Sequence, residues 1–223
     1  MDNFQTIEAI HTSGVYPKRN LTIVRGKGSH VWDENGQEYI DCISGHGVVN
    51  IGHCHPSVVS AVEKQAKQLI TCPEVFHNDQ RARLLDHLAA LTPEGMQRAF
   101  LCNSGTEAVE AALKFARIST GRSKLSSTLR SFHGRTMGSL TLTGQKKHRM
   151  PFEPLLPHVT HMPFNKTEAL HKSVSERTAA VILEVVQGEG GVGLADAEYL
   201  HTAQQLCHQT GALQLLAEVT TGP

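Results

Sequence analysis

Residues 103–117 read NSGTEAVEAALKFAR, a short polar turn that runs directly into a helix-forming stretch. Ser104 followed by Glu107 predicts a capping box, in which each side chain accepts a hydrogen bond from a free backbone N–H at the helix start. Glu110 precedes Lys114 by four residues, so these two side chains are expected to pair along the helix. The remaining N–H donors and the helix dipole predict an anion site, although a capping box also occurs in helices with a purely structural role.

The composition excludes several classes of protein. The chain has 223 residues, with 21 Lys and Arg against 21 Asp and Glu, and no basic, aromatic-rich stretch typical of a nucleic-acid face. Residues 1–20 lack the apolar core of a signal peptide, and no later window is apolar enough to cross a membrane. The five cysteines are scattered without a close pair, which indicates reduced thiols. We therefore expect a cytoplasmic protein that binds neither nucleic acid nor membrane.

Histidine is abundant, with 14 residues, and residues 53–55 read His-Cys-His. Adjacent side chains point in different directions, whereas a zinc site needs ligands whose spacing aims them at one point. This segment reads more simply as a turn before a helix over 57–69, and no metal site is expected.

Periodicity along the chain predicts an α/β fold. Residues 31–40 hold Asn-Gly between two strand-like arms, the signal for a tight hairpin. Farther along, short apolar runs alternate with helical patterns, which favours a mainly parallel sheet covered by helices on both faces. We expect an N-terminal segment over 1–70, with the hairpin and a linking helix, followed by an α/β domain over 71–223. The expected elements after the linking helix are a helix around 84–91, strands at 124–129, 179–183 and 212–216, and a helix over 198–208.

Ligands of parallel sheets collect at the carboxyl ends of the strands. Polar or glycine-rich turns follow three expected strands, which end at Cys102, Leu183 and Leu216. These turns are therefore expected to form one cleft. The glycine-rich segment 188–191 is only a weak match to a dinucleotide-binding fingerprint, because no helix follows it directly.

Three ordered motifs carry a resemblance to a known family. FHGRT at 132–136 and QGEGG at 187–191, added to the helix start at 103–117, resemble the class III pyridoxal-phosphate aminotransferases over nearly the whole chain. Within the class the chain is most similar to the acetylornithine aminotransferase group, including its LysW-lysine aminotransferase relatives. A 4-aminobutyrate or ornithine aminotransferase is the nearest competitor. The resemblance implies a pyridoxal-phosphate-dependent transferase of fold type I, active as a homodimer.

The resemblance also implies roles for individual residues. Phe132 would stack on the pyridine ring, and Arg135 would bind a substrate carboxylate through its forked donors. Glu189 would face the substrate side. The cofactor phosphate would be held at the helix start by Ser104, Gly105 and Thr106.

The last residues depart from the family pattern. Ala217 stands where the family has the aspartate that pairs with the pyridine nitrogen, and Thr220 stands where it has a glutamine near the ring hydroxyl. No lysine follows Lys172, although the family forms its aldimine with a lysine well beyond this point. We therefore expect an N-terminal portion of an aminotransferase, with the C-terminal part missing and no activity of its own.

The implied reaction moves an amino group from acetylornithine or a similar ω-amino substrate to 2-oxoglutarate, as in arginine or lysine biosynthesis. The partners would be a small amino acid and an oxo acid. Two other classes stay open, namely a non-catalytic relative that binds a phosphate compound or a protein partner, and a nucleotide-binding α/β protein.

Overall fold

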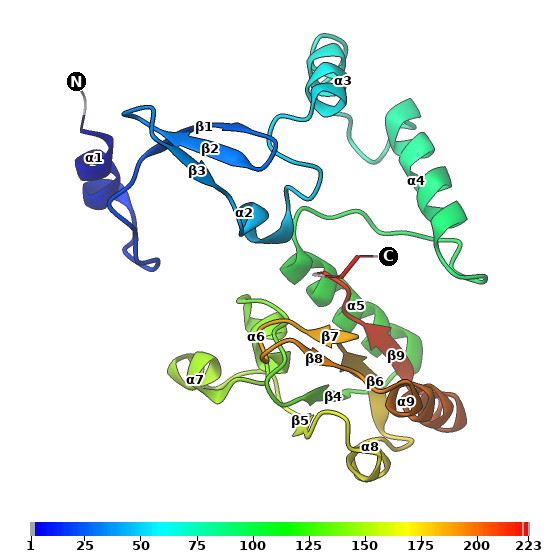
Figure 1. Cartoon of the computed structure of the whole chain (residues 1–223). Helices are drawn as coiled ribbons and strands as arrows, with labels where there is room; N and C mark the ends of the chain where they lie inside the picture. The colour runs from blue at the N-terminus through cyan, green and yellow to red at the C-terminus, as the bar shows by residue number, and fades with distance from the viewer. Residues whose placement is uncertain (1–2, 220, 223) are drawn as a thin grey trace. The chain divides into compact units, whose positions relative to one another are not determined.

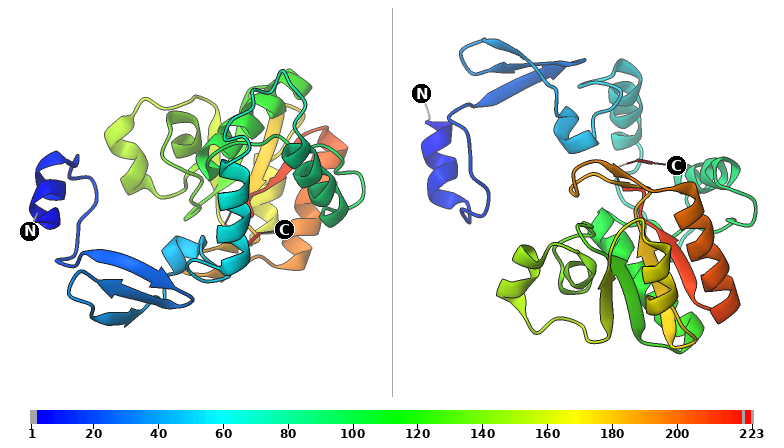
Figure 2. Two further views of the ribbon diagram at one scale, coloured as in Figure 1. Left: turned by 90° about the horizontal axis from the view of Figure 1, so that it is seen from above. Right: turned by 60° about the horizontal axis from the view of Figure 1, so that its bottom comes forward.

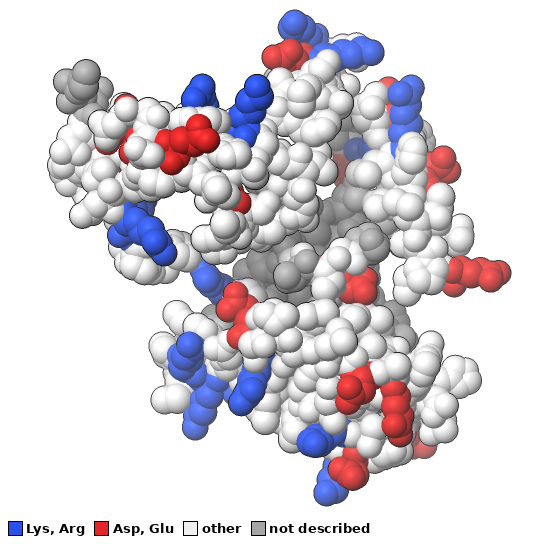
Figure 3. Space-filling model, viewed as in Figure 1, with Lys and Arg blue, Asp and Glu red and all other residues white. Residues whose placement is uncertain are grey.

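The chain forms two compact units, Met1–Asn78 and Asp79–Pro223 (Figure 1). The computed structural model describes residues 3–219, 221 and 222. Among these residues, no helix is both long and apolar enough to span a membrane. Both acidic and basic side chains are exposed in Figure 3, in keeping with their equal numbers in the sequence.

The first unit contains the hairpin that the sequence predicts. Strand β1 pairs with β2, and β2 pairs with β3, all antiparallel. In the turn between β2 and β3, Asp33 Oδ1 accepts hydrogen bonds from the backbone N–H groups of Asn35 and Gln37, both at 2.9 Å. Gly36 has a φ of 82°, which a residue with a side chain rarely adopts. The three strands are β1 (Ile23–Lys27), β2 (His30–Asp33) and β3 (Glu38–Ile40).

This unit has little apolar interior. Asp33 is the one buried residue among its described positions, and apolar side chains such as Val48 and Val62 are exposed. Burial of apolar surface is the main driving force of folding, and this unit buries little of it. We therefore expect the hydrogen bonds of its sheet to contribute a large share of its stability. Its helices are α1 (Phe4–His11), α2 (Ser44–Gly47) and α3 (Pro56–Ala66).

The second unit is built on a four-stranded parallel sheet in the order β5-β4-β6-β9 (Figure 2). Every residue of the central strand β6 is buried, as expected when helices cover both faces of a parallel sheet. The fold prediction is therefore confirmed. The strands are β4 (Lys124–Thr128), β5 (Val159–Met162), β6 (Thr178–Leu183) and β9 (Leu213–Leu216).

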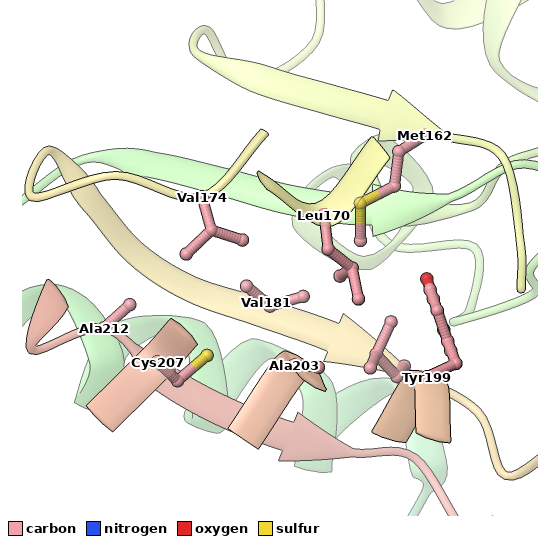
Figure 4. Close-up of a cluster of buried hydrophobic side chains, with 9 residues drawn as sticks. Met162, Leu170, Val174, Val181, Tyr199, Ala203, Cys207 and Ala212 are labelled. Carbon is pink, nitrogen blue, oxygen red and sulfur yellow. The ribbon is translucent and has the colours of Figure 1, made fainter. Parts of the chain in front are cut away.

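Alternate residues of β6 enter two separate cores. Val181 and Leu183 pack with helices α8 and α9, around Tyr199 (Figure 4). Ala180 and Ile182 pack on the opposite face, with residues of helices α5 and α6. The four helices are α5 (Gly105–Thr120), α6 (Met137–Leu142), α8 (Thr167–Ser173) and α9 (Ala197–Thr210). The unit also contains α4 (Asp79–Leu91), α7 (Lys146–Arg149), the 3-10 helix η1 (Met150–Phe152), β7 (Val186–Gln187) and β8 (Gly193–Leu194).

One expected strand is wrong. Residues 99–102 are apolar in sequence, but they form no strand, and none of the described strands pairs with them. Phe100 instead lies edge-on to Phe115, with 5.7 Å between the ring centroids, and both side chains are largely exposed. An apolar run becomes a strand only where a neighbouring strand offers hydrogen bonds, and 99–102 has no such neighbour.

Candidate functional site

Helix α5 begins with the predicted capping box. Ser104 Oγ accepts a hydrogen bond from the backbone N–H of Glu107 at 3.3 Å. The Glu107 carboxylate accepts from the backbone N–H of Asn103 at 2.7 Å, one residue before the position that an ideal capping box uses. Both ends of the turn are thereby held, and α5 starts at Gly105.

The segment after β9 reaches the same helix start. A Cβ atom on Gly105 would lie 2.9 Å from Val219 Cγ1, so only glycine allows this close approach. On the adjacent strand, the carbonyl of Leu183 accepts a hydrogen bond from the backbone N–H of Ala217 at 2.7 Å. The start of α5 and the carboxyl ends of β6 and β9 therefore converge.

A cluster of hydroxyl groups joins the start of α5 to the loop 132–136. Thr106 Oγ1 lies 2.9 Å from Thr136 Oγ1 and 2.6 Å from Ser139 Oγ. Gly134 has a φ of 133°, and a Cβ atom there would lie 2.8 Å from the Cβ of Thr106. Two motifs about thirty residues apart in sequence thus meet at hydrogen-bonding distance.

Glu110 anchors this contact, a role that the sequence reasoning missed. Its Oε1 accepts hydrogen bonds from the Thr136 hydroxyl at 2.5 Å and from the backbone N–H groups of Gly138 and Ser139 at 2.9 and 3.1 Å. The expected pair with Lys114 is not among the three salt bridges of the described residues. Three donors at the start of α6 attract the carboxylate more strongly than one exposed ammonium group.

A signal for this role was present in the sequence. Residues 137–142 hold no acidic residue, so a helix there has no acceptor of its own for the N–H groups of its first turn. Free N–H groups at a helix start need an acceptor from elsewhere. Glu110, one helical turn after Glu107 of the capping box, was therefore a candidate for the acceptor.

Glu110→Gln is expected to destabilise the second unit by about 1–3 kcal/mol, because charge-assisted hydrogen bonds would become neutral ones. Urea denaturation followed by circular dichroism measures the change. Glu107→Gln is the matched control on the same helix, and a loss below about 1 kcal/mol is expected there because that carboxylate is exposed. Equal losses in both variants would contradict the anchoring role.

Phe132 and Arg135 lie on one loop. The Phe132 side chain is half-buried, whereas the Arg135 side chain is exposed, with Cζ 5.9 Å from the centroid of the Phe132 ring. This distance is at the outer limit of a cation–π contact. An aromatic face and a guanidinium group are thus presented side by side.

The turn between β7 and β8 carries Glu189, which is exposed. Gln187 holds this turn against β4, because its buried Nε2 donates hydrogen bonds to Thr128 Oγ1 at 2.8 Å and to the carbonyl of Leu129 at 3.1 Å. The backbone of the turn makes a further hydrogen bond, because Gln145 Nε2 donates to the carbonyl of Glu189 at 3.4 Å. The glycine-rich segment therefore forms a fixed turn beside β4 with no helix after it.

Glu184, directly after β6, is buried and carries a perturbed carboxyl group. Its pKa is raised to about 7, mainly because burial disfavours the charged form; the nearby backbone N–H of Phe132 acts in the opposite direction, and repulsion from Glu189 adds to the increase. Its Oε2 has no hydrogen-bond partner among the described residues. Sequence reasoning named Glu184 only as the residue after a strand and gave it no role.

The contacts bring most of the expected site residues into one region of the second unit. Thr106 contacts the loop that carries Phe132 and Arg135, Gly105 contacts the segment after Ala217, and the Phe132 N–H faces Glu184. Thr220 lies outside the described residues.

The family model described as Aminotransferase class-III matches residues 13–223. The chain belongs to this family. It is 48% identical over 217 residues to the [LysW]-aminoadipate semialdehyde transaminase of Deinococcus radiodurans, covering 96% of this chain and 51% of the relative. It is 45% identical over 208 residues to the acetylornithine aminotransferase of Methanosarcina acetivorans, covering 93% of this chain and 52% of the relative. This class-III aminotransferase chain thus spans about half the length of the curated relatives it matches.

Solved aminotransferases share the fold. The ornithine aminotransferase of Toxoplasma gondii, whose structure reveals partial occupancy of PLP at its active site, superposes with a TM-score of 0.90 at 30% identity, covering 98% of this chain and 53% of that one. The adenosylmethionine-8-amino-7-oxononanoate aminotransferase of Methanocaldococcus jannaschii superposes with a TM-score of 0.91 at 25% identity, with coverages of 98% and 55%. The class-III aminotransferase chain therefore has the fold of PLP-dependent aminotransferases, as the sequence predicts.

Proposed function

We propose that this chain binds pyridoxal phosphate at the start of α5. The observation that supports this most strongly is the contact of Thr106 with Thr136 and Ser139, because it joins the start of α5, a helix end of the kind that attracts anions, to the loop with Phe132 and Arg135. In an α-helix the backbone N–H groups of the first turn, here those of Gly105 and Thr106, have no acceptor within the helix and suit an anion. Phosphate would be held by Ser104, Gly105 and Thr106.

Phe132, Arg135 and Glu189 suit the pyridine ring of the cofactor and the substrate. Phe132 would stack on the pyridine ring, Arg135 would bind the carboxylate of an amino acid or oxo acid, and Glu189 would border the substrate. When bound, the cofactor supplies an electron sink for chemistry at the amino-bearing carbon. The positions that depart from the family, Ala217 and Thr220, lack the carboxylate and the amide expected there.

The proposed reaction of the whole protein is transfer of an amino group from acetylornithine or a similar ω-amino substrate to 2-oxoglutarate, in arginine or lysine biosynthesis. The names of the two relatives given above support this choice, and a 4-aminobutyrate or ornithine substrate is the alternative. We propose a homodimer as the active form and residues 71–223 as part of the cofactor-binding domain. The absence of a disulfide among the described cysteines suits a reducing cytoplasm.

We further propose that this chain binds the cofactor without turning over substrate, because Ala217 and Thr220 lack the carboxylate and the amide expected beside the ring. Measurable transamination by the purified chain would contradict this part. A non-catalytic phosphate-binding role is the second candidate, supported by the same two departures.

Binding is tested by titrating the chain with pyridoxal phosphate in equilibrium dialysis. We expect one saturable site, and we expect Thr106→Val to weaken binding about ten-fold or more, since a hydrogen bond to a charged group is lost. Thr202→Val, on α9, is the matched control and should leave the affinity unchanged. Absence of saturable binding would contradict the proposal, and equal affinity for unrelated phosphate esters would favour the second candidate.

A further inference from the structure

The carboxyl end of β6 buries an acidic group that none of the proposed roles uses. Glu184 is 7% exposed, and its Oε2 has no hydrogen-bond partner among the described residues. A buried carboxylate oxygen without a donor is destabilising, and buried polar groups in native proteins almost always have partners. The orphaned oxygen therefore indicates a missing donor.

The strand register places Glu184 beside Ala217. Leu183 of β6 pairs with Leu216 of β9, so Glu184 and Ala217 are the next residues on two adjacent parallel strands. Ala217 packs against the core on the α5 face of the sheet, which also receives Ile182, two residues before Glu184. Side chains two residues apart along an extended chain share a face.

The same carboxyl group faces the aromatic loop. The backbone N–H of Phe132 lies close enough to the Glu184 carboxyl group to lower its pKa, so this group borders the residue proposed to stack on the ring. The Ala217 methyl group beside it is too small to fill the place of a longer acidic side chain. A carboxyl group, an aromatic face and a small neighbour thus occur together at one strand end.

The charged surroundings favour a cationic or N–H donor as the missing partner. Glu189 is the charged group that acts on Glu184, and it repels the carboxylate. No salt bridge of the described residues involves Glu184. A donor brought by a ligand would relieve the burial of the charge, whereas an anion or an apolar group would not.

We propose that Glu184 binds the ring nitrogen of the pyridine ligand, the contact for which Ala217 has no carboxylate. The protonated ring nitrogen donates its N–H to the Glu184 carboxylate; where the carboxyl group is neutral before binding, its O–H bond breaks as the N–H bond forms, and a carboxylate–pyridinium pair results in either case. This inference rests on the proposed function, because it requires a pyridine phosphate at the start of α5. It adds the residue that follows β6 to a site otherwise built from α5, the segment after β9 and the loop 132–136.

The test compares two ligands that differ in one ring atom. Pyridoxine 5′-phosphate carries the ring nitrogen, and its carbocyclic analogue has a C–H group there. Isothermal titration of the chain should show the pyridine compound binding about ten-fold tighter or more, as expected for one charge-assisted hydrogen bond. Glu184→Leu should remove the preference while leaving the affinity for the analogue nearly unchanged, because the phosphate contacts remain.

Two further variants make the test specific. Ala217→Asp in the Glu184→Leu background should restore the preference for the nitrogen, since it returns a carboxylate to the adjacent strand on the same face. Glu176→Gln, an exposed carboxyl group in the turn before β6, is the control and should keep the native preference. Glu184→Gln, which is isosteric, serves if Glu184→Leu does not fold, and it should reduce the preference.

Nitrogen-15 NMR of labelled pyridoxine 5′-phosphate gives a readout that a purely structural role would not change. The ring nitrogen should be protonated at pH 8 in the native complex and unprotonated in the Glu184→Leu complex. Equal binding of the two ligands by the native chain, or a protonated nitrogen without Glu184, would overturn this inference and leave the proposed function standing. Failure of the native chain to bind either phosphate would overturn both.

Discussion

Replacing Gly134 with alanine is expected to destabilise the second unit by about 3 kcal/mol or more and to abolish cofactor binding. The new Cβ atom would lie 2.8 Å from the Cβ of Thr106 and within contact of the Ser139 hydroxyl. Overpacking of this kind costs about 1–3 kcal/mol, and the positive φ of 133° adds a conformational cost of similar size. Relief would require the loop 132–136 to move away from α5, which breaks the hydroxyl cluster.

Urea denaturation measures the stability of this variant, and equilibrium dialysis measures its affinity for pyridoxal phosphate. Gly191→Ala is the matched control, because Gly191 also has a positive φ, 102°, but has no atom within 4 Å of the added Cβ. The control therefore carries the conformational cost without the clash. If Gly134→Ala were no less stable than Gly191→Ala, the close approach of the loop to α5 would be contradicted.

Glu184→Gln is expected to gain stability relative to the native chain as the pH rises. The pKa of Glu184 is raised from 4.5 to about 7, mainly by burial. The unfolded chain releases this proton at lower pH than the folded chain does, so the native chain loses stability as the pH rises from about 4.5 through 7. The glutamine variant has no proton to lose, and its advantage should grow by up to about 3 kcal/mol between pH 4 and pH 8.

Urea denaturation of both chains at several pH values measures this difference. His133 and His161 also change the stability with pH, because burial lowers the pKa of each to about 4 and the unfolded chain therefore takes up their protons first as the pH falls below 6.5. This acid loss should be the same in both chains and cancel in the comparison. A difference in stability that stays constant with pH would show that Glu184 ionises normally in the folded chain.

Local signals account for the parts of the fold that the sequence predicts correctly. The Asn-Gly turn of the hairpin, the Ser104–Glu107 cap of α5 and the apolar run of β6 each depend on residues that are neighbours in sequence. The prediction fails at 99–102, where strand formation depends on a distant partner that the local composition does not reveal.

The amino-acid sequence by itself determined the parallel α/β sheet, the capped start of α5 and membership of the class-III aminotransferases, because periodicity, capping and motifs are written in short stretches of residues. The tertiary structure decided the surroundings of Glu110 and Glu184. Glu110 binds the start of α6 instead of Lys114, and Glu184 lies beside Ala217 with one oxygen unpaired. The physical reason is that these neighbours are distant in sequence. Gly138 lies 28 residues after Glu110 and Ala217 lies 33 residues after Glu184, so each pair becomes adjacent only when the sheet and its helices have formed.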